Sequence, residues 1–396
     1  MGHPYICIAG KNDIAVDVLD YVIRNYGKDS LGIVCNKTET GENSFQRSLR
    51  RFALKNNIRE HRLEEIYGIN NLLFISLEFD QLINPYLFKD ARLYNIHFSM
   101  LPKYKGMFTS AHPILNGEHY SGVTLHLIDA GIDTGDIIDQ QQFEIEDSDD
   151  CKDIYLKYIK YGTEVVLKNI DDLIWNRAMA RAQSVQDSSY YSRKSLDYSN
   201  LCIDLNQTAE GIGRQIRAFS FRNYQLPQVF GKQIIDFQIL NSKSLLKPGT
   251  AILREDSFVT ISTIDYNMSL YFDRFDELME ACEIGNLDTV KDICVVRKHI
   301  NEQDKNGWSP LIKATYNNRI EIVEYLIAFG ANVRMKNRNG TNLLMYAKET
   351  YKRSRDNTLF KLFCNLGVSE KEMDYDGHDL LYYIEKDRIT LKELKS

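Results

Sequence analysis

The sequence has few cysteines and no long apolar run. Its seven cysteines are scattered along 396 residues, and no two of them form a Cys-x-x-Cys pair. This pattern argues against a disulfide framework and against a zinc site, so we expect no metal. No window approaches the roughly 20 apolar residues that span a bilayer, and residues 1–13 resemble a strand entering a turn rather than a secretion signal. We therefore expect a cytoplasmic protein that does not bind membranes.

The sequence also lacks a strong net charge and several catalytic motifs. The formal net charge is only −6, which predicts no strong attraction to nucleic acid. The sequence has no Ser or Cys nucleophile elbow, no HExxH pair and no Walker loop. Its first strand-to-helix turn has only Gly10, so the dinucleotide fingerprint is absent too. These absences argue against the nucleophile-elbow hydrolases, zinc proteases, P-loop enzymes and dinucleotide-binding enzymes.

The first half of the chain alternates strand and helix signals. Short apolar runs at residues 5–9, 31–35 and 72–76 are typical of strands, and residues 45–55 and 148–175 have helical spacing. This alternation predicts an α/β fold, a Rossmann-like core with a mostly parallel sheet. Ligands bind such sheets beyond the carboxyl ends of the strands.

The pattern changes from about residue 201. A helical segment, 208–219, precedes strand-like segments at 228–240, 250–253 and 259–264. We expect a small strand-rich module here that joins two copies into a homodimer.

The last third contains an internal repeat. DKNGWSPLIKA begins at Asp304 and NRNGTNLLMYA at Asn337, so their glycines stand 33 residues apart, and a weaker copy begins at Asp374. Period and pattern resemble ankyrin repeats, with an apparent insertion at residues 353–357. The expected domains are 1–200 (catalytic), 201–272 (strand-rich module) and 273–396 (α-helical ankyrin repeats).

The densest chemical signal lies in residues 93–138. Asn95 and His97 stand two apart, so on a strand end both side chains point to the same face, and Asp133 lies in a glycine-rich loop. An Asn, a His and an Asp that converge can polarise a carbonyl, move a proton and orient the imidazole. An Asn-x-His at a strand end is also commonly a hydrogen-bonded turn, so spacing alone leaves both interpretations open.

The same segment resembles the signature of the 10-formyltetrahydrofolate-dependent formyltransferases. Asn-x-His is followed by Ser-Met-Leu-Pro at 99–102, with Met100 in place of the usual Leu, and by a complete Gly-Ile-Asp-Thr-Gly at 131–135. The resemblance implies that Asn95, His97 and Asp133 are catalytic and that 10-formyltetrahydrofolate donates the formyl group. Asn95 and protonated His97 would stabilise the oxyanion, while Asp133 would favour the charged imidazole and help to remove the amine proton.

The resemblance also implies a pterin pocket built from two loops. Its expected residues are Leu77, Glu78, Phe79, Ile128, Asp129 and Gly131. Leu77 and Phe79 are equally compatible with an ordinary core.

The acceptor follows from resemblance and not from any single residue. Residues 8–23 and 212–234 resemble nucleotide-linked amino-sugar N-formyltransferases. Together with the ankyrin repeats they favour dTDP-3-amino-3,6-dideoxyglucose, a sugar for O-antigen and lipopolysaccharide biosynthesis. Four alternatives stay open: a dTDP-4-amino sugar, methionyl-tRNA, hydrolysis of the formyl-folate, and a binding scaffold without catalysis.

Chemistry suggests contacts to the sugar nucleotide. Lys11, Asn12, Arg193 and Lys194 are candidates for the diphosphate, and Tyr224 is a candidate to stack on thymine. Each is also compatible with a solvated loop charge or a packed aromatic.

Trp308 is a candidate for a second binding site, because it falls at the usually exposed tip of a repeat hairpin. An exposed Trp there typically packs on a protein partner or the preceding domain. The alternative is that it holds a planar anion such as a nucleotide beside nearby cations.

Overall fold

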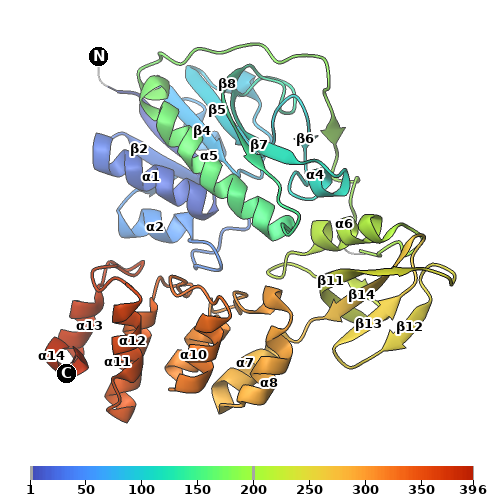
Figure 1. Cartoon of the computed structure of the whole chain (residues 1–396). Coiled ribbons are helices and arrows are strands. Elements are labelled where there is room, and N and C mark those ends of the chain that lie inside the picture. The colour runs from blue at the N-terminus through green and yellow to red at the C-terminus, as the bar shows by residue number, and fades with distance from the viewer. Residues whose placement is uncertain (1–2, 199–200, 396) are drawn as a thin grey trace. The chain divides into compact units, whose positions relative to one another are not determined.

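The computed structural model describes residues 3–198 and 201–395 and has two compact units (Figure 1). The first comprises Met1–Glu42 and Gln46–Val229, and the second comprises Asn43–Phe45 and Phe230–Ser396. The three-domain division stays a prediction. By its contacts, helix α6 (Ala209–Phe219) belongs to the first unit, because its buried Ile212 and Ile216 side lies among helices α4 and α5.

A seven-stranded sheet forms the centre of the first unit. Its order is β3-β2-β1-β4-β5-β7-β8, with β3 to β5 parallel and β7 and β8 antiparallel. The sheet is thus mostly parallel, as the sequence predicted. The bounds are β1 (Tyr5–Gly10), β2 (Leu31–Cys35), β3 (Arg59–Glu60), β4 (Leu72–Leu77), β5 (Ala91–His97), β7 (Tyr120–Leu127) and β8 (Ile137–Glu144).

Helices α1 and α5 lie side by side along one face of this sheet (Figure 1). Helix α1 buries Ile14, Val18 and Leu19 on a single stripe. Helix α5 begins at a capping box in which Asp150 and Asp153 satisfy each other's backbone N–H groups. Bounds of the helices in this unit are α1 (Asn12–Tyr26), α2 (Leu49–Lys55), α3 (Leu63–Ile66), α4 (His112–Leu115), α5 (Cys151–Ile174) and α6 (Ala209–Phe219).

A short parallel ribbon stands beside the sheet. β6 (Lys105–Gly106) pairs with β9 (Tyr190–Tyr191). Gly106 has a φ of 90°, and a Cβ there would come within 2.2 Å of the Tyr191 carbonyl oxygen. Only glycine fits this close approach, which fixes the segment after β5.

The second unit begins with an antiparallel sheet in the order β11-β14-β13-β12. The sequence analysis missed β14, which alternates buried Met268 and Leu270 with polar residues. The expected strand 228–240 is interrupted, because Phe230 and Gly231 both have positive φ and turn the chain. The bounds are β10 (Gln228–Val229), which ends the first unit, then β11 (Lys232–Lys243), β12 (Ala251–Arg254), β13 (Phe258–Ile261) and β14 (Tyr266–Phe272).

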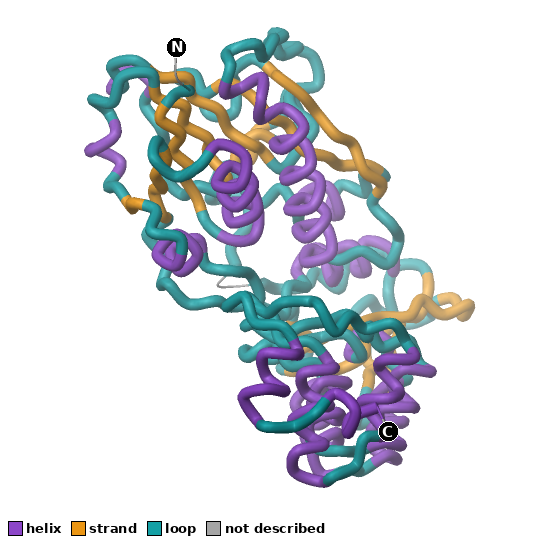
Figure 2. The backbone as a smooth tube through the Cα atoms, turned by 90° about the vertical axis from the view of Figure 1, so that its left-hand side faces the viewer, coloured by secondary structure: helices purple, strands orange, loops and turns teal. Residues whose placement is uncertain are grey.

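Helix pairs complete the second unit (purple in Figure 2). Each repeat hairpin is built alike: the side chain of Asp304, Asn337 or Asp374 accepts backbone N–H groups two and four residues later. The insertion expected near residue 353 lengthens α11 to 12 residues against 7 in α9. The helices are α7 (Phe275–Ile284), α8 (Leu287–Cys294), α9 (Pro310–Tyr316), α10 (Ile320–Ala328), α11 (Leu343–Ser354), α12 (Thr358–Asn365), α13 (Leu380–Asp387) and α14 (Leu391–Lys395).

Within residues 3–198 and 201–395, no helix combines the length and apolarity needed to cross a membrane.

Candidate active site

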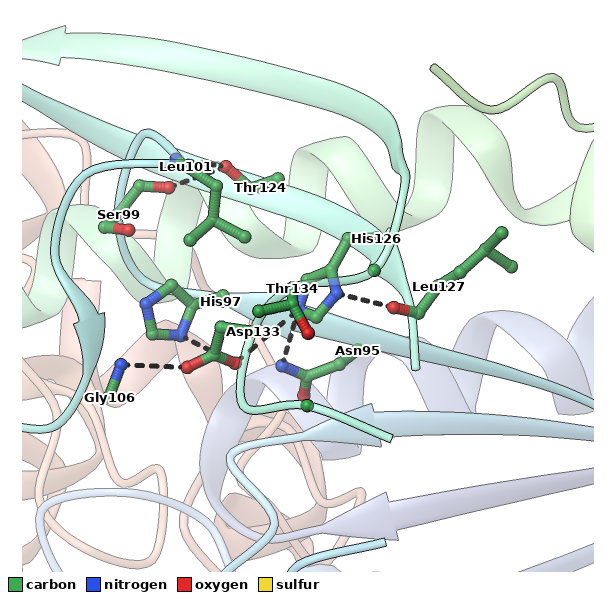
Figure 3. A network of polar contacts seen from close by, with 12 residues as sticks. Asn95, His97, Ser99, Leu101, Gly106, Thr124, His126, Leu127, Asp133 and Thr134 are labelled. Atoms are coloured by element: carbon green, nitrogen blue, oxygen red, sulfur yellow. Dashed lines mark hydrogen bonds and ion pairs between the residues drawn. The ribbon is translucent and has the colours of Figure 1, made fainter. Parts of the chain in front are cut away.

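Four polar side chains share one face where β5 pairs with β7 (Figure 3). Asn95 stands opposite His126, and His97 stands opposite Thr124. Alternation along each strand points both pairs the same way. Thr124 holds the turn that follows β5, because its hydroxyl donates to the Ser99 carbonyl at 2.7 Å. The predicted Asn-x-His pair therefore lies at the carboxyl end of a buried strand, beside a second histidine.

The hydrogen bonds of His126 fix the orientation of Asn95. His126 Nδ1 lies 2.7 Å from the carbonyl oxygen of Leu127, so this nitrogen carries the proton. Its Nε2 is then an acceptor and receives the amide Nδ2 of Asn95 at 3.1 Å. An amide nitrogen has two hydrogens, so Asn95, which is only half-buried, retains one N–H for a ligand.

Both ring nitrogens of His97 face oxygen atoms. Nε2 donates to the carbonyl oxygen of Tyr104 at 2.8 Å, and Nδ1 lies 3.5 Å from Asp133 Oδ1. A neutral imidazole has one N–H and satisfies only one of these acceptors, whereas the imidazolium satisfies both. The surroundings therefore stabilise His97 once it has taken up a proton.

Asp133 is held by groups from three segments. Its backbone has a φ of 54°, in the left-handed region, and the side-chain amide of Gln183 donates to its carbonyl oxygen at 2.9 Å. Its Oδ2 accepts the Gly106 N–H at 2.9 Å, and its Oδ1 lies 3.7 Å from His126 Nε2. The structure thus brings Asn95, His97 and Asp133 together, as the sequence predicted.

Charge and burial set the protonation states of this cluster. Burial raises the pKa of Asp133, but the positive charge of protonated His97, the adjacent His126 ring and the Gly106 N–H outweigh it and hold the pKa at about 2. Burial lowers the pKa of His97, while the Asp133 carboxylate opposes that shift. Asp133 is therefore a carboxylate at neutral pH, ready to pair with a proton on His97.

The arrangement suits acyl transfer. The free amide N–H of Asn95 can donate to an oxyanion, and the His97–Asp133 pair can accept a proton from an attacking amine. His97 can donate to that oxyanion only if its Nε2–H breaks its hydrogen bond to the Tyr104 carbonyl oxygen and bonds the substrate oxygen instead. Across the described residues, no group of three His, Cys, Asp or Glu side chains has the geometry to hold a metal ion.

The residues expected to bind the pterin divide between two places. Phe79 and Ile128 pack against the same hydrophobic cluster as Phe74, while Leu77 is fully buried. The exposed loop residues Asp129 and Gly131 bond to each other. A cavity of about 430 Å³ lies beside this loop and is lined by residues including Phe88, Leu93, Leu127, Ile128 and Asp129.

The side chain of Glu78, another of the expected pterin residues, bonds to a separate group of residues. Its carboxylate accepts from the Tyr155 hydroxyl at 2.9 Å and from the Asn12 amide at 3.2 Å. The second amide hydrogen of Asn12 goes to Tyr155, also at 2.9 Å. Both Asn12 donors are thus occupied, so its side chain has no N–H left for a diphosphate, whereas the Lys11 ammonium is near enough to lower the pKa of Glu78.

Tyr224 joins this group through a row of aromatic rings. The Tyr155 and Phe221 centroids are 5.4 Å apart, and those of Phe221 and Tyr224 are 4.7 Å apart. Tyr224 is 61% exposed, and an exposed Tyr ring is of a kind that stacks on a base. Arg193 and Lys194 are exposed in the loop after β9 and belong to a different part of this unit.

Sequence reasoning missed four polar residues around the site. They are His126, Tyr155, Tyr104 and Gln183, and none of them was among the predicted site residues. The alternation of Thr124 and His126 in a strand next to the Asn-x-His motif was a usable signal for His126. The positions of Tyr155 and Gln183 depend on packing across more than 45 residues, which local patterns do not encode.

Trp308 is less exposed than the sequence suggested. Its ring is half-buried and packs edge-on against Tyr316 and Tyr346, with centroids 5.1 and 5.2 Å away. Cations lie over this aromatic cluster: Lys313 over Trp308 and Arg353 over Tyr316. The prediction of a freely exposed tryptophan is therefore wrong, because neighbouring repeats supply aromatic partners for it.

Comparison with known proteins gives two family matches and close relatives. Residues 35–170 match the formyl transferase family, and residues 278–383 match three copies of the ankyrin repeat. Methionyl-tRNA formyltransferase of Fervidobacterium nodosum is 28% identical over 227 residues, which are 55% of this chain and 71% of that protein.

Two solved structures are more similar. WlaRD, a sugar 3N-formyl transferase solved in the presence of dTDP and 5-N-formyl-THF, is 45% identical, with a TM-score of 0.63 over 68% of this chain and 98% of WlaRD. The N-formyltransferase of Helicobacter canadensis, in complex with folinic acid and dTDP-3-aminofucose, is 41% identical, with a TM-score of 0.63 over 68% of this chain and 100% of that one.

Proposed function

Because this chain belongs to the formyl transferase family, as a sugar N-formyltransferase, we propose that it moves a formyl group from 10-formyltetrahydrofolate to the amine of a dTDP-linked amino-dideoxysugar. The observation that carries the proposal is the cluster of Asn95, His97 and Asp133 at the carboxyl edge of the sheet. The relatives solved with a folate and with dTDP or a dTDP-amino sugar support the choice of both substrates.

The proposed chemistry is direct transfer. The neutral amine attacks the formyl carbon, the second N–H of Asn95 donates to the oxyanion, and His97 takes the amine proton with Asp133 stabilising the imidazolium. The bond from the formyl carbon to the folate nitrogen then breaks, and His97 passes the proton it has taken to that nitrogen as it leaves. Folate supplies the activated formyl group, and this chain supplies charge stabilisation and proton transfer. The cavity lined by Phe88 and Ile128 is our candidate pterin pocket.

For the acceptor we favour dTDP-3-amino-3,6-dideoxyglucose, used in O-antigen and lipopolysaccharide biosynthesis in the cytoplasm. The 3-amino position is supported by the two 3N relatives above 40% identity. A methionyl-tRNA acceptor has weaker support, because those relatives are less identical and the chain has a net charge of −6.

A mass-spectrometric transfer assay tests this function. The purified full chain is incubated with 10-formyltetrahydrofolate and, separately, with dTDP-3-amino and dTDP-4-amino dideoxysugars, a UDP-amino sugar, methionyl-tRNA, and no amine. We expect the mass of CO to be added only to the dTDP-3-amino sugar. Transfer to the 4-amino sugar would change the acceptor, formate release without an amine would indicate a hydrolase, and no product in any arm would indicate a binding scaffold.

We propose that the antiparallel sheet of the second unit forms a homodimer. Strand β12 and the loop before it expose large apolar side chains that water disfavours, among them Leu245, Leu246, Ile252 and Leu253. Among the described residues, no further strand pairs with the outer edge of β12. Sedimentation velocity should give twice the monomer mass for the wild type and the monomer mass for Leu253→Asp. A monomeric wild type would contradict the proposal.

For the ankyrin repeats we propose binding of a protein partner or of a second nucleotide at Trp308. The edge-packed rings of Trp308, Tyr316 and Tyr346 beside Lys313 and Arg353 supply aromatic surface and positive charge. In an Asn95→Ala/His97→Ala variant, a second class of dTDP-sugar binding that Trp308→Ala abolishes would support the nucleotide. A single class of sites that Trp308→Ala leaves unchanged would leave only the protein partner.

A further inference from the structure

Glu78 is a half-buried carboxyl at the carboxyl edge of the sheet that the proposed transfer chemistry does not use. It follows Leu77, whose register partners are Gly10 on β1 and Ile96 on β5. Glu78 therefore lies between the strand that ends at Gly10, just before Lys11, and the strand that ends at His97. Adjacent strands are about 4.8 Å apart, so a ligand of sugar size reaches across this interval.

Three neighbouring side chains hold Glu78 in place. Tyr155 and Asn12 donate to its carboxylate, as described above. Asn36, only 1% exposed, donates to the Glu78 carbonyl oxygen at 2.8 Å, and its own side-chain oxygen has no hydrogen-bond partner among the described residues. An unsatisfied buried acceptor costs about 1–3 kcal/mol, which a donor from a ligand would recover.

The backbone at this place is also held in an unusual conformation. Glu78 and Asn12 have φ values of 57° and 66°, in the left-handed region that costs an ordinary side chain about 1 kcal/mol or more. Burial raises the pKa of Glu78 to about 7, against the charge of Lys11 and the bonds from Tyr155 and Asn12. A titratable group with a shifted pKa, held by several polar contacts at the carboxyl edge of a sheet, is typical of functional sites.

From this geometry, and resting on the proposed function, we propose that Glu78 is an acceptor-specificity residue that accepts a hydrogen bond from a ring hydroxyl of the amino sugar. A carboxylate suits a hydroxyl donor and repels a diphosphate. The reacting amine is a poorer occupant, because pairing with Glu78 would keep it protonated and unable to attack. Tyr155 acts through Glu78 and is a positioning residue.

Exposed Tyr224 and half-buried Lys11 complete the arrangement. The aromatic row from Tyr155 through Phe221 to Tyr224 leads away from Glu78 to an exposed ring of a kind that stacks on thymine. The Lys11 ammonium, whose charge reaches Glu78, suits the diphosphate between base and sugar. In this arrangement the base stacks on Tyr224 and the diphosphate meets Lys11. The ring hydroxyl then bonds Glu78, and the amine lies near Asn95.

Calorimetric titration of the full chain tests this inference without folate. The ligands are dTDP-3-amino-3,6-dideoxyglucose and dTDP, which has no sugar to meet Glu78. We expect Glu78→Gln to weaken binding of the amino-sugar nucleotide by about 10-fold or more and to leave dTDP binding unchanged, because a neutral amide oxygen is a weaker acceptor than a carboxylate. Tyr155→Phe should give a smaller loss of the same selectivity. Tyr161→Phe, on the same helix, should give none.

Three results would overturn the assignment. Unchanged amino-sugar binding in Glu78→Gln would remove Glu78 from the acceptor site. Equal losses for dTDP and the amino sugar would assign it to the nucleotide. A rise in KM for 10-formyltetrahydrofolate alone would return it to the pterin pocket. Failure of the proposed function looks different, because the wild type would then bind neither dTDP ligand. If Glu78→Gln does not fold, Tyr155→Phe decides by the same comparison.

Discussion

At the scale of single residues, the amide of Asn95 is divided between two tasks. One N–H is given to His126, and the other stays free for a developing oxyanion. The oxyanion gains this bond only as charge builds on the formyl oxygen, so the free N–H stabilises the transition state more than the bound substrate.

Replacing Asn95 by Ala should therefore lower kcat by about 100- to 1,000-fold with little change in KM, the usual cost of losing one such donor. Steady-state transfer to the dTDP-3-amino sugar measures the effect. Asn25→Ala, in the exposed part of α1, is the control and should retain full activity. A loss confined to KM would show that Asn95 only binds substrate.

His126 tests orientation separately from chemistry. Its Nε2 accepts from Asn95, so His126→Leu should release the amide and lower kcat by about 10-fold, in the range of a positioning effect. His126→Gln supplies another acceptor and should recover most of that loss. Equal activity of both variants, compared by kcat at saturating substrate, would contradict the positioning role.

At the scale of elements, the β6–β9 ribbon aligns the proposed catalytic pair, His97 and Asp133. It positions two backbone groups: the Tyr104 carbonyl oxygen, which accepts from His97, and the Gly106 N–H, which donates to Asp133. The Tyr104 N–H in turn donates to the Ser189 hydroxyl at 2.8 Å. The ribbon has only two residues in each strand, so its alignment depends on the close approach at Gly106.

Gly106→Ala should reduce both activity and stability. The new Cβ would lie 2.2 Å from the Tyr191 oxygen as well as at a positive φ, so we expect a loss of about 2–4 kcal/mol in the free energy of unfolding. Gly27→Ala is the matched control, with a φ of 82° and open space around the new Cβ. It should cost only about 1 kcal/mol and leave kcat unchanged. Urea unfolding with parallel kcat measurements compares them, and equal losses would rule out the clash.

How far the elements could be predicted depended on how local their causes are. The apolar runs of β1, β2 and β4 and the long helix α5 follow from residue patterns. Ser48 caps α2, which shortens the helix expected from residue 45. The ribbon at Gly106 and the Glu78 contacts with Tyr155 arise from pairing across the chain, and sequence spacing does not specify such pairings.

At the scale of the molecule, buried histidines link the stability of the first unit to pH. Burial lowers the pKa of His112 to about 4, where it bonds to Ser195 and stacks on Tyr191. In the unfolded chain the same imidazole takes up its proton near pH 6.5. Between about pH 4 and 6.5 the unfolded state therefore binds more protons than the folded state, and the free energy of unfolding falls as the pH falls. Burial shifts His61 and His97 in the same direction.

We expect the first unit to lose about 1–3 kcal/mol of stability through His112 between pH 7 and pH 4.5. Urea unfolding followed by fluorescence measures it. In a Trp308→Phe background, Trp175 at the end of α5 is the remaining tryptophan and reports the first unit alone. His112→Phe preserves the stacking on Tyr191 and should flatten the pH dependence, and an unchanged slope in this variant would refute the linkage.

The proposed catalytic trio lies in one continuous stretch, from β5 to the loop before β8, whereas Asn12, Tyr155 and Tyr224 come from distant parts of the chain. Chemistry and substrate choice are thus encoded in separable segments. A gene could exchange the pieces around residues 12, 78, 155 and 224 by recombination and acquire a new acceptor while the transfer machinery stays intact. For a designer, residues 91–144 form a cassette to keep, and the remaining edge of the sheet is the region to diversify.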